Sequence, residues 1–167
     1  YVEEMGVGVG EGFSVNVPLR PQTDDEVYLW AFNEVVPPLL QRFRPDVLVT
    51  QLGVDTHMDD PLTHMMLTTA GHEALYAAFA ALAPACWLAC GGGGYNLEVV
   101  PRSWTLAFGV MSEQDFDDAL PESYRAQYGG QWLRDKARSP INEATRERTR
   151  AHAETVVSEV KQRWDLR

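Results

Sequence analysis

Acidic and imidazole side chains gather in one short stretch of the sequence, directly after an apolar run. The run is DVLVTQL (residues 46–52), and the loop that follows contains the titratable residues Asp55, His57, Asp59, Asp60 and His64. Asp55 and His57 are two residues apart, so at the end of a strand their side chains point the same way and could bind one metal ion. The Asp-x-His spacing is also common by chance, and an exposed surface pair is the alternative interpretation.

Four consecutive glycines, Gly91–Gly94, stand directly before Tyr95. Because glycine loses the most conformational entropy on folding, such a run indicates a backbone that adopts a positive φ or lets a ligand approach closely. A tight turn into a helix is the simplest alternative. A phosphate-binding loop is a second alternative, because the turn leads into a helix N-terminus. The Lys of the P-loop pattern and the acidic residue of the dinucleotide fingerprint are both absent, so nucleotide binding is the weaker interpretation.

These polar segments follow apolar runs that alternate with helical patterns. The first predicted helix has a capping pattern at Thr23–Glu26 and ends at Pro45. After it we expect a strand over 46–52, a helix capped by Thr68 or Thr69, a strand over 85–90 and a helix capped by Asn96. This alternation is typical of an α/β fold with a parallel sheet. Ligands of such sheets bind beyond the carboxyl ends of the strands, so the loops after the two strands are the expected site.

The same patterns predict several local features. FSVNVPL (13–19) has the alternation of a short strand, and Pro37-Pro38 should kink or divide the first helix. Cys86 and Cys90 lie too far apart along a strand to form a disulfide, and we expect reduced, buried thiols. The third helix should turn four apolar residues inward: Leu97, Val100, Trp104 and Phe108.

Charge is unevenly distributed along the 167 residues, whose formal net charge is −10. Residues 1–123 carry 18 acidic and 4 basic side chains, whereas residues 124–167 carry 6 acidic and 10 basic ones. An acidic body is repelled by phosphate backbones, which argues against a nucleic-acid partner. The basic part contains a predicted helix over 142–164 with one sparse apolar stripe. It could contact an acidic partner, but a solvated helix face is the preferred interpretation.

Neither a membrane span nor a secretion signal is visible in the sequence. No stretch approaches the ~20 consecutive apolar residues of a membrane-spanning helix. No basic-then-apolar leader precedes the first glycine-rich segment. Together with the absence of a disulfide pair, this predicts a cytoplasmic protein without a membrane partner.

Two segments, LGVDTHMDDPLTHMMLT (52–68) and GGGGYNLEVVPRSW (91–104), closely resemble the carboxyl-terminal half of the zinc-dependent histone deacetylase superfamily. The DPLTH wording is similar to that of the bacterial acetoin-utilization branch. The resemblance implies the three-layer arginase/deacetylase α/β fold, a parallel sheet with flanking helices, here as a partial domain. The expected organisation is a carboxyl-terminal part of a deacetylase domain over 1–112, an acidic linker and loop over 113–140, and a carboxyl-terminal helix over 141–167.

The resemblance also implies roles for individual residues. Asp55 matches a zinc ligand of the family, with Fe²⁺ as the alternative metal. Tyr95 matches the catalytic tyrosine that hydrogen-bonds the acetyl carbonyl and the oxyanion, and Gly93 and Gly94 match the lining of the acyl-lysine tunnel. Such an enzyme would hydrolyse the acetyl amide of acetylated proteins or acetylated polyamines with zinc-activated water. Met65-Met66 stands where animal deacetylases usually carry an aromatic residue and Asn, so the pocket wall differs there.

The rest of the family's site has no counterpart in this sequence. The family's other two zinc ligands and its tandem-His base lie upstream, and no histidine precedes Asp55. One carboxylate does not hold a zinc ion that takes three protein ligands and a water. Two hypotheses follow. The chain is part of a deacetylase and is inactive alone, or it is a non-catalytic α/β module that needs a complementary chain. The sparse apolar stripe of the predicted helix 142–164 leaves room for a partner, so an oligomer is a further alternative.

Overall fold

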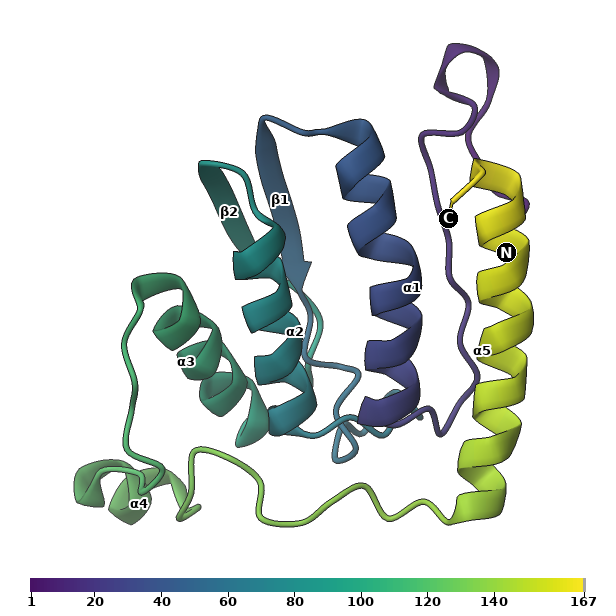
Figure 1. Cartoon of the computed structure of the whole chain (residues 1–167). Coiled ribbons are helices and arrows are strands. Elements are labelled where there is room, and N and C mark those ends of the chain that lie inside the picture. The colour runs from purple at the N-terminus through teal and green to yellow at the C-terminus, as the bar shows by residue number, and fades with distance from the viewer. Residues whose placement is uncertain (167) are drawn as a thin grey trace.

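Helices flank a small parallel sheet in the structure, a computed structural model that describes residues 1–166 (Figure 1). This mixed α/β arrangement agrees with the predicted fold class. The described residues contain no helix long and apolar enough to cross a membrane. In chain order the elements are a 3-10 turn Gly8–Gly10, α1 Asp25–Phe43, β1 Val47–Leu52, α2 Thr69–Leu82, β2 Cys86–Gly91, α3 Val99–Ser112, α4 Glu122–Tyr128 and α5 Glu143–Trp164.

Strands β1 and β2 pair in parallel, from Val47 opposite Cys86 to Leu52 opposite Gly91. One face of this sheet is covered by α2 and α3. The core on this side contains Leu52 of β1, helical residues from α2 and α3, and Leu133 from the segment after α4. The carboxyl ends of both strands therefore open toward the same edge, where the two predicted site loops begin.

The opposite face of the sheet is exposed. Val47, Val49 and Leu88 alternate with the covered positions, and they are 50%, 61% and 56% exposed. The prediction of buried cysteines is wrong, because Cys86 and Cys90 have the same orientation and are exposed free thiols. The physical reason is that helices of the described residues cover only one face of a strand whose apolar run had suggested two buried faces.

Helix α1 begins and ends as the sequence predicted. Asp24 caps it by accepting a hydrogen bond from Val27 N at 3.3 Å, and Arg44, just before Pro45, ends it in a left-handed conformation. The sequence predicted that Pro37 and Pro38 kink or divide this helix; both lie inside one continuous helix, so they do not divide it. The buried α1 residues Val27, Ala31, Phe32 and Val35 all precede the prolines, and their packing holds the helix in place.

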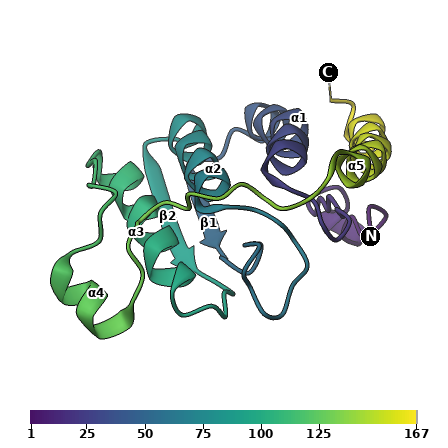
Figure 2. The same cartoon turned by 90° about the horizontal axis from the view of Figure 1, so that it is seen from below.

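Helix α5 packs against α1, and the amino-terminal segment lies along one side of this helix pair (Figure 2). Its buried side chains include Val156, Val157, Val160 and Trp164, which form the single apolar stripe expected for residues 142–164. Residues 13–19 are extended but do not form a strand, which corrects the prediction. Their apolar side chains Val15, Val17 and Leu19 pack against the core between α1 and α5 instead of joining a sheet.

Helix α3 is rotated relative to the prediction. It buries Val99, Ser103, Leu106, Ala107 and Gly109, whereas Leu97 before it and Phe108 are largely exposed. Since α3 turns its Ser103–Leu106 side toward α2, Phe108 faces the surface, whereas Val100 is half-buried. Trp104 is an intermediate case, because its Nε1 donates to Leu52 O at 2.8 Å at the end of β1.

Candidate active site

The loop after β1 brings Asp55 against the glycine turn after β2. Val54 N donates to Gly93 O at 2.7 Å, which joins the two loops through their backbones. A methyl group at Gly93 would overlap the Asp55 carboxylate, so the glycine is required for this approach. Gly94 has φ +131°, and a Cβ there would lie 2.8 Å from Val100 Cγ2. Asp55 and Gly93 are therefore in contact, and Gly94 packs beside Val54 and Val100.

Tyr95 is tied to the same loop by a buried carboxylate. Asp60, 8% exposed, accepts a hydrogen bond from Tyr95 N at 2.8 Å through Oδ2. Its Oδ1 accepts from Leu62 N at 2.9 Å and Thr63 N at 3.3 Å. The Tyr95 side chain itself is 53% exposed, so its phenol is accessible from solvent while its backbone is fixed.

Asn96 adds a second connection between the two loops. Its Nδ2 donates to Asp59 O at 3.0 Å, and its Oδ1 accepts from Glu98 N at 3.0 Å and Val99 N at 3.3 Å. The sequence predicted Asn96 as the helix cap. It does satisfy amides at the start of α3, although the helix begins at Val99 and its formal cap, Glu98, makes no side-chain bond.

His57 does not form a chelating pair with Asp55. Its side chain is fully buried, and Nε2 lies 2.8 Å from Asp135 Oδ2. Asp59 N donates to its Nδ1 at 3.1 Å. Both ring nitrogens are thus used inside the protein, and neither is free to join Asp55 on a metal ion. The alternative of an exposed surface pair is also wrong, because 0% of His57 is exposed.

A second buried histidine supports the loop from α2. His72 Nε2 lies 2.9 Å from Thr56 Oγ1, and its Nδ1 lies 3.0 Å from Ser103 Oγ. Ser103 also lies 2.7 Å from Tyr76 Oη. Burial, with a smaller effect of His57, lowers the pKa of His72 to about 4, so the imidazole is neutral at pH 7. The hydrogen bonds of this neutral imidazole hold Thr56, the residue that follows Asp55.

Asp135 reaches this site from the segment that the sequence predicted as linker. It accepts from Thr69 N at 2.8 Å and from Arg102 Nη1 at 2.9 Å, in addition to its contact with His57. Burial pushes the pKa of Asp135 upward. The hydrogen bonds from His57, Thr69 and Arg102 outweigh that effect and hold the pKa well below its ordinary value. Asp135 is therefore an ionised, largely buried carboxylate.

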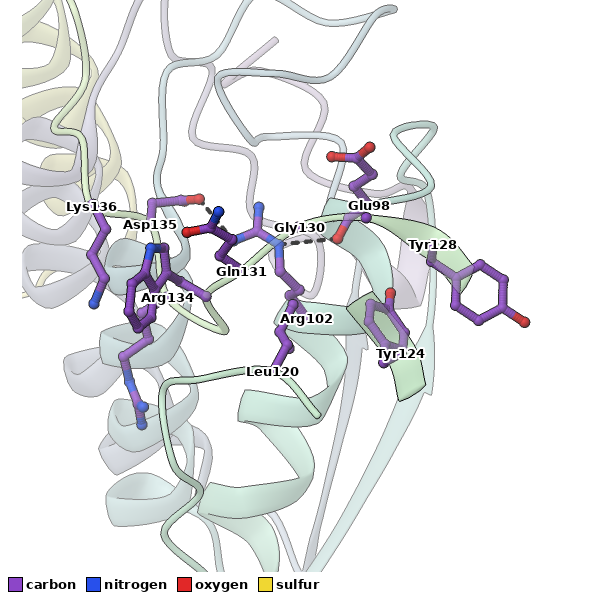
Figure 3. Close-up of a pocket in the computed structure, with 12 residues that line it drawn as sticks. Glu98, Arg102, Leu120, Tyr124, Tyr128, Gly130, Gln131, Arg134, Asp135 and Lys136 are labelled. Carbon is purple, nitrogen blue, oxygen red and sulfur yellow. Dashed lines mark hydrogen bonds and ion pairs between the residues drawn. The ribbon is translucent and has the colours of Figure 1, made fainter. Parts of the chain in front are cut away.

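Arg102 also lines a pocket of about 230 Å³, which Figure 3 shows. Its Nε donates to Glu98 O at 3.0 Å, while Tyr124 and Tyr128 line the same pocket. The cations of this pocket are paired: Arg102 with Asp135, Arg134 with Glu73, and Lys136 with Asp118. The pocket contains neither Asp55 nor Tyr95, so it is separate from the predicted site.

The donor set around Asp55 does not complete a metal site. Within residues 1–166, no group of three or more His, Cys, Asp or Glu side chains is arranged to hold a metal ion. Catalytic zinc takes three protein ligands and leaves one position open. Asp55 thus stands as one candidate ligand, and the residues beside it do not supply the others.

The structure brings together all four residues that the resemblance singled out. Asp55 and Gly93 are in contact, Gly94 follows in the turn, and Tyr95 is linked through Asp60. Asp135 and Arg102 were missed by the sequence reasoning. No short-range pattern could have found them, since 78 residues separate His57 from Asp135.

Comparisons with known proteins identify the family. The histone deacetylase domain matches residues 1–111. The acetoin utilization protein AcuC of Staphylococcus xylosus is 37% identical over 134 residues, which are 77% of this chain and 35% of that protein. Histone deacetylase clr6 of Schizosaccharomyces pombe is 31% identical over 160 residues, 96% of this chain and 39% of that protein.

The AcuC protein of Bacillus subtilis (strain 168) is 36% identical over 128 residues, 74% of this chain and 33% of that protein. The chain thus spans between a third and two fifths of the length of these relatives. The family match covers the loop of Asp55, the glycine turn and Tyr95, so it includes every residue of the predicted site. The chain belongs to the histone deacetylase family.

Proposed function

We propose that this chain is the part of a metal-dependent deacetylase that carries the oxyanion-binding tyrosine and one metal-ligating carboxylate. The substrates would be acetyl-lysine in proteins or an acetylated polyamine. The observation that carries the proposal is the packing of the Asp55 carboxylate against Gly93 in a loop that also holds Tyr95 through Asp60. The names of the relatives, acetoin utilization protein and histone deacetylase, support the same class.

Tyr95 has the chemistry that amide hydrolysis requires. Its fixed backbone and half-exposed phenol can present an O–H group to the oxyanion that forms when the amide carbonyl is attacked. A preorganised donor of this kind lowers a barrier by about 3 kcal/mol. The family resemblance assigns Gly93 and Gly94 to the lining of the acyl-lysine tunnel, and their missing side chains let Asp55 and Val100 pack closely against this turn.

A zinc ion, or Fe²⁺ in its place, would supply Lewis-acid chemistry and an activated water when bound. Asp55 fits the role of one carboxylate ligand, but the residues around it do not complete the set. We therefore expect the isolated chain to be inactive. The remaining ligands and the general base would have to come from further residues of a longer protein or from a complementary chain.

The exposed sheet face favours a second candidate, a non-catalytic module that associates with such a complementary chain. Parallel sheets are almost always covered on both faces, whereas Val47, Val49 and Leu88 are at least half exposed. A partner that covered this face would complete the three-layer fold that the resemblance implies. A nucleic-acid or membrane partner is not part of the proposal, given the strongly acidic residues 1–123. The free thiols Cys86 and Cys90 are consistent with a cytoplasmic location.

Metal content and turnover test the proposal directly. Hydrolysis of an acetyl-lysine peptide and of acetylated spermidine is measured for the chain alone and for the chain co-expressed with the part of Bacillus subtilis AcuC outside its match. We expect turnover only in the complex, abolished by Asp55→Ala and reduced about 100-fold or more by Tyr95→Phe.

Two results would contradict the proposal. Turnover by the isolated chain with one tightly bound zinc would show that the site is already complete. A complex that forms but turns over equally well with Tyr95→Phe would remove the tyrosine from the reaction. A complex without turnover in either form would favour the non-catalytic module.

A further inference from the structure

The segment after α4 passes beneath the amino-terminal ends of the helices on its way to α5 (Figure 1). It lies beyond residue 111, where the family match ends. Asp135 is one of the points at which this segment is attached, next to the buried Leu133 and the Arg134–Glu73 ion pair. Its backbone N donates to Thr69 Oγ1 at 2.7 Å, and its side chain, 10% exposed, accepts from Thr69 N at 2.8 Å. Thr69 is the first residue of α2.

The same carboxylate holds the loop of Asp55 through His57. Since Asp59 N donates to His57 Nδ1 at 3.1 Å, that nitrogen is an acceptor, and the proton of a neutral ring resides on Nε2. His57 Nε2 then donates to Asp135 Oδ2 at 2.8 Å. The imidazole thus connects the loop to Asp135, and Arg102 Nη1 occupies the other carboxylate oxygen at 2.9 Å.

From His57 the connection continues to Tyr95. Asp60 N donates to His57 O at 3.0 Å, and the Asp60 carboxylate accepts from Tyr95 N at 2.8 Å. Asp55 lies two residues before His57. One buried carboxylate therefore holds, through a single imidazole, the loop that presents Asp55 and fixes the backbone of Tyr95.

We propose that Asp135 is a positioning residue for Asp55 and Tyr95, supplied by a segment beyond residues 1–111, which the histone deacetylase domain matches. This inference rests on the proposed function for the meaning of the two positioned residues. Asp135 does not touch the region in which the substrate would lie. It acts by holding the loop after β1 rigid through His57, so that Asp55 and Tyr95 keep a constant separation.

Amide hydrogen exchange of the whole chain, followed by NMR, tests the inference with Asp135→Asn. The amide group of Asn cannot accept all the hydrogen bonds that the carboxylate accepts, so the loop should open more often. We expect the amides of His57 and Tyr95, bonded to Val54 O and Asp60, to exchange at least tenfold faster. The helical amides of Ala31 and Val157 should change less, and the exposed control Glu154→Gln should change none of them.

An equal acceleration of all four amides would overturn the inference, because it would show a general loss of stability. Unchanged exchange at His57 and Tyr95 would overturn it as well. If Asp135→Asn does not fold, Thr69→Val tests the inference in its place, since it removes only the hydroxyl that accepts a hydrogen bond from Asp135 N. This variant should accelerate the same two amides, and the same two results would overturn the inference.

The exchange experiment does not need turnover, so it can be interpreted even if the proposed function fails. In the complex that hydrolyses an acetyl-lysine peptide, Asp135→Asn should lower kcat at least tenfold and leave KM within twofold. We expect kcat to fall without a change in KM because the variant displaces Asp55 and Tyr95 but leaves the surface that binds the substrate unchanged. An unchanged kcat in an active complex would contradict the positioning role.

Discussion

The carboxylate of Asp60 accepts a hydrogen bond from the backbone N–H of Tyr95 at 2.8 Å, and this bond ties the loop after β1 to the turn after β2. Asp60 is 8% exposed and uses its second oxygen for Leu62 N and Thr63 N. A single side chain therefore shapes its own loop and fixes the neighbouring one.

Asp60→Asn should separate these two tasks. The Asn oxygen can still accept from Leu62 N and Thr63 N, but its NH₂ group would then face Tyr95 N–H. A buried donor without a partner costs about 1–3 kcal/mol. Urea unfolding should show this loss, and amide exchange should accelerate at Tyr95. Asp59→Asn is the matched control, because the Asp59 side chain is 58% exposed. Equal stability of the two variants would contradict the role of Asp60.

Gly93→Ala should displace the Asp55 carboxylate, because the added methyl group would overlap it. Overpacking of this kind destabilises by about 1–3 kcal/mol. Gly10→Ala is the control, because no atom lies within 4 Å of a Cβ at that position. Urea unfolding of both variants provides the measurement. A stability loss at Gly10 as large as that at Gly93 would show that the contact with Asp55 is not the cause.

Acid should weaken the fold through His72. Its pKa is lowered to about 4 from 6.5, so the unfolded chain binds a proton more readily than the folded one. The contribution of neutral His72 to the free energy of unfolding is fully present above pH 6.5 and is lost progressively as the pH falls to about 4. The total is on the order of 3 kcal/mol. Burial raises the pKa of Asp25, which offsets part of this loss.

Urea unfolding at pH 7.5 and at pH 4.5 measures this dependence. His72→Asn should have a smaller difference between the two pH values than the wild type. His152→Asn is the control variant, because His152 lies on α5, outside the hydrogen-bond network of His72, and bonds Pro18 O at 3.2 Å. An identical difference in all three proteins would exclude His72 as the source.

Valine truncations should distinguish the buried core from the open sheet face. Val160 is fully buried between α5 and α1, and Val160→Ala should cost about 2 kcal/mol because it leaves a cavity. Val49 is 61% exposed, and Val49→Ala should change the stability of the isolated chain by less than about 0.5 kcal/mol. Thermal unfolding compares the two. A large loss at Val49 would mean that another copy of the chain already covers this face.

Local patterns in the sequence predicted much of the secondary structure and identified the candidate residues. Short-range signals sufficed for the caps at Asp24 and Thr68, for β1 and for the single stripe of α5, because these depend on residues within a few positions of each other. The motif around Asp55 and Tyr95 is equally local. The motif was therefore enough to identify both residues as candidates, without knowledge of how their loops pack.

Which polar groups meet in the interior depends on how distant segments pack, so local patterns could not predict it. His57 had two interpretations from its spacing, a metal ligand or a surface residue, and the fold buried it against Asp135 instead. The exposed thiols of Cys86 and Cys90 show the same limit, because an apolar run does not reveal how many faces of a strand are covered. Periodicity records which side chains are apolar over a few turns. The partner of a buried charge is set by the packing of segments far apart in the chain.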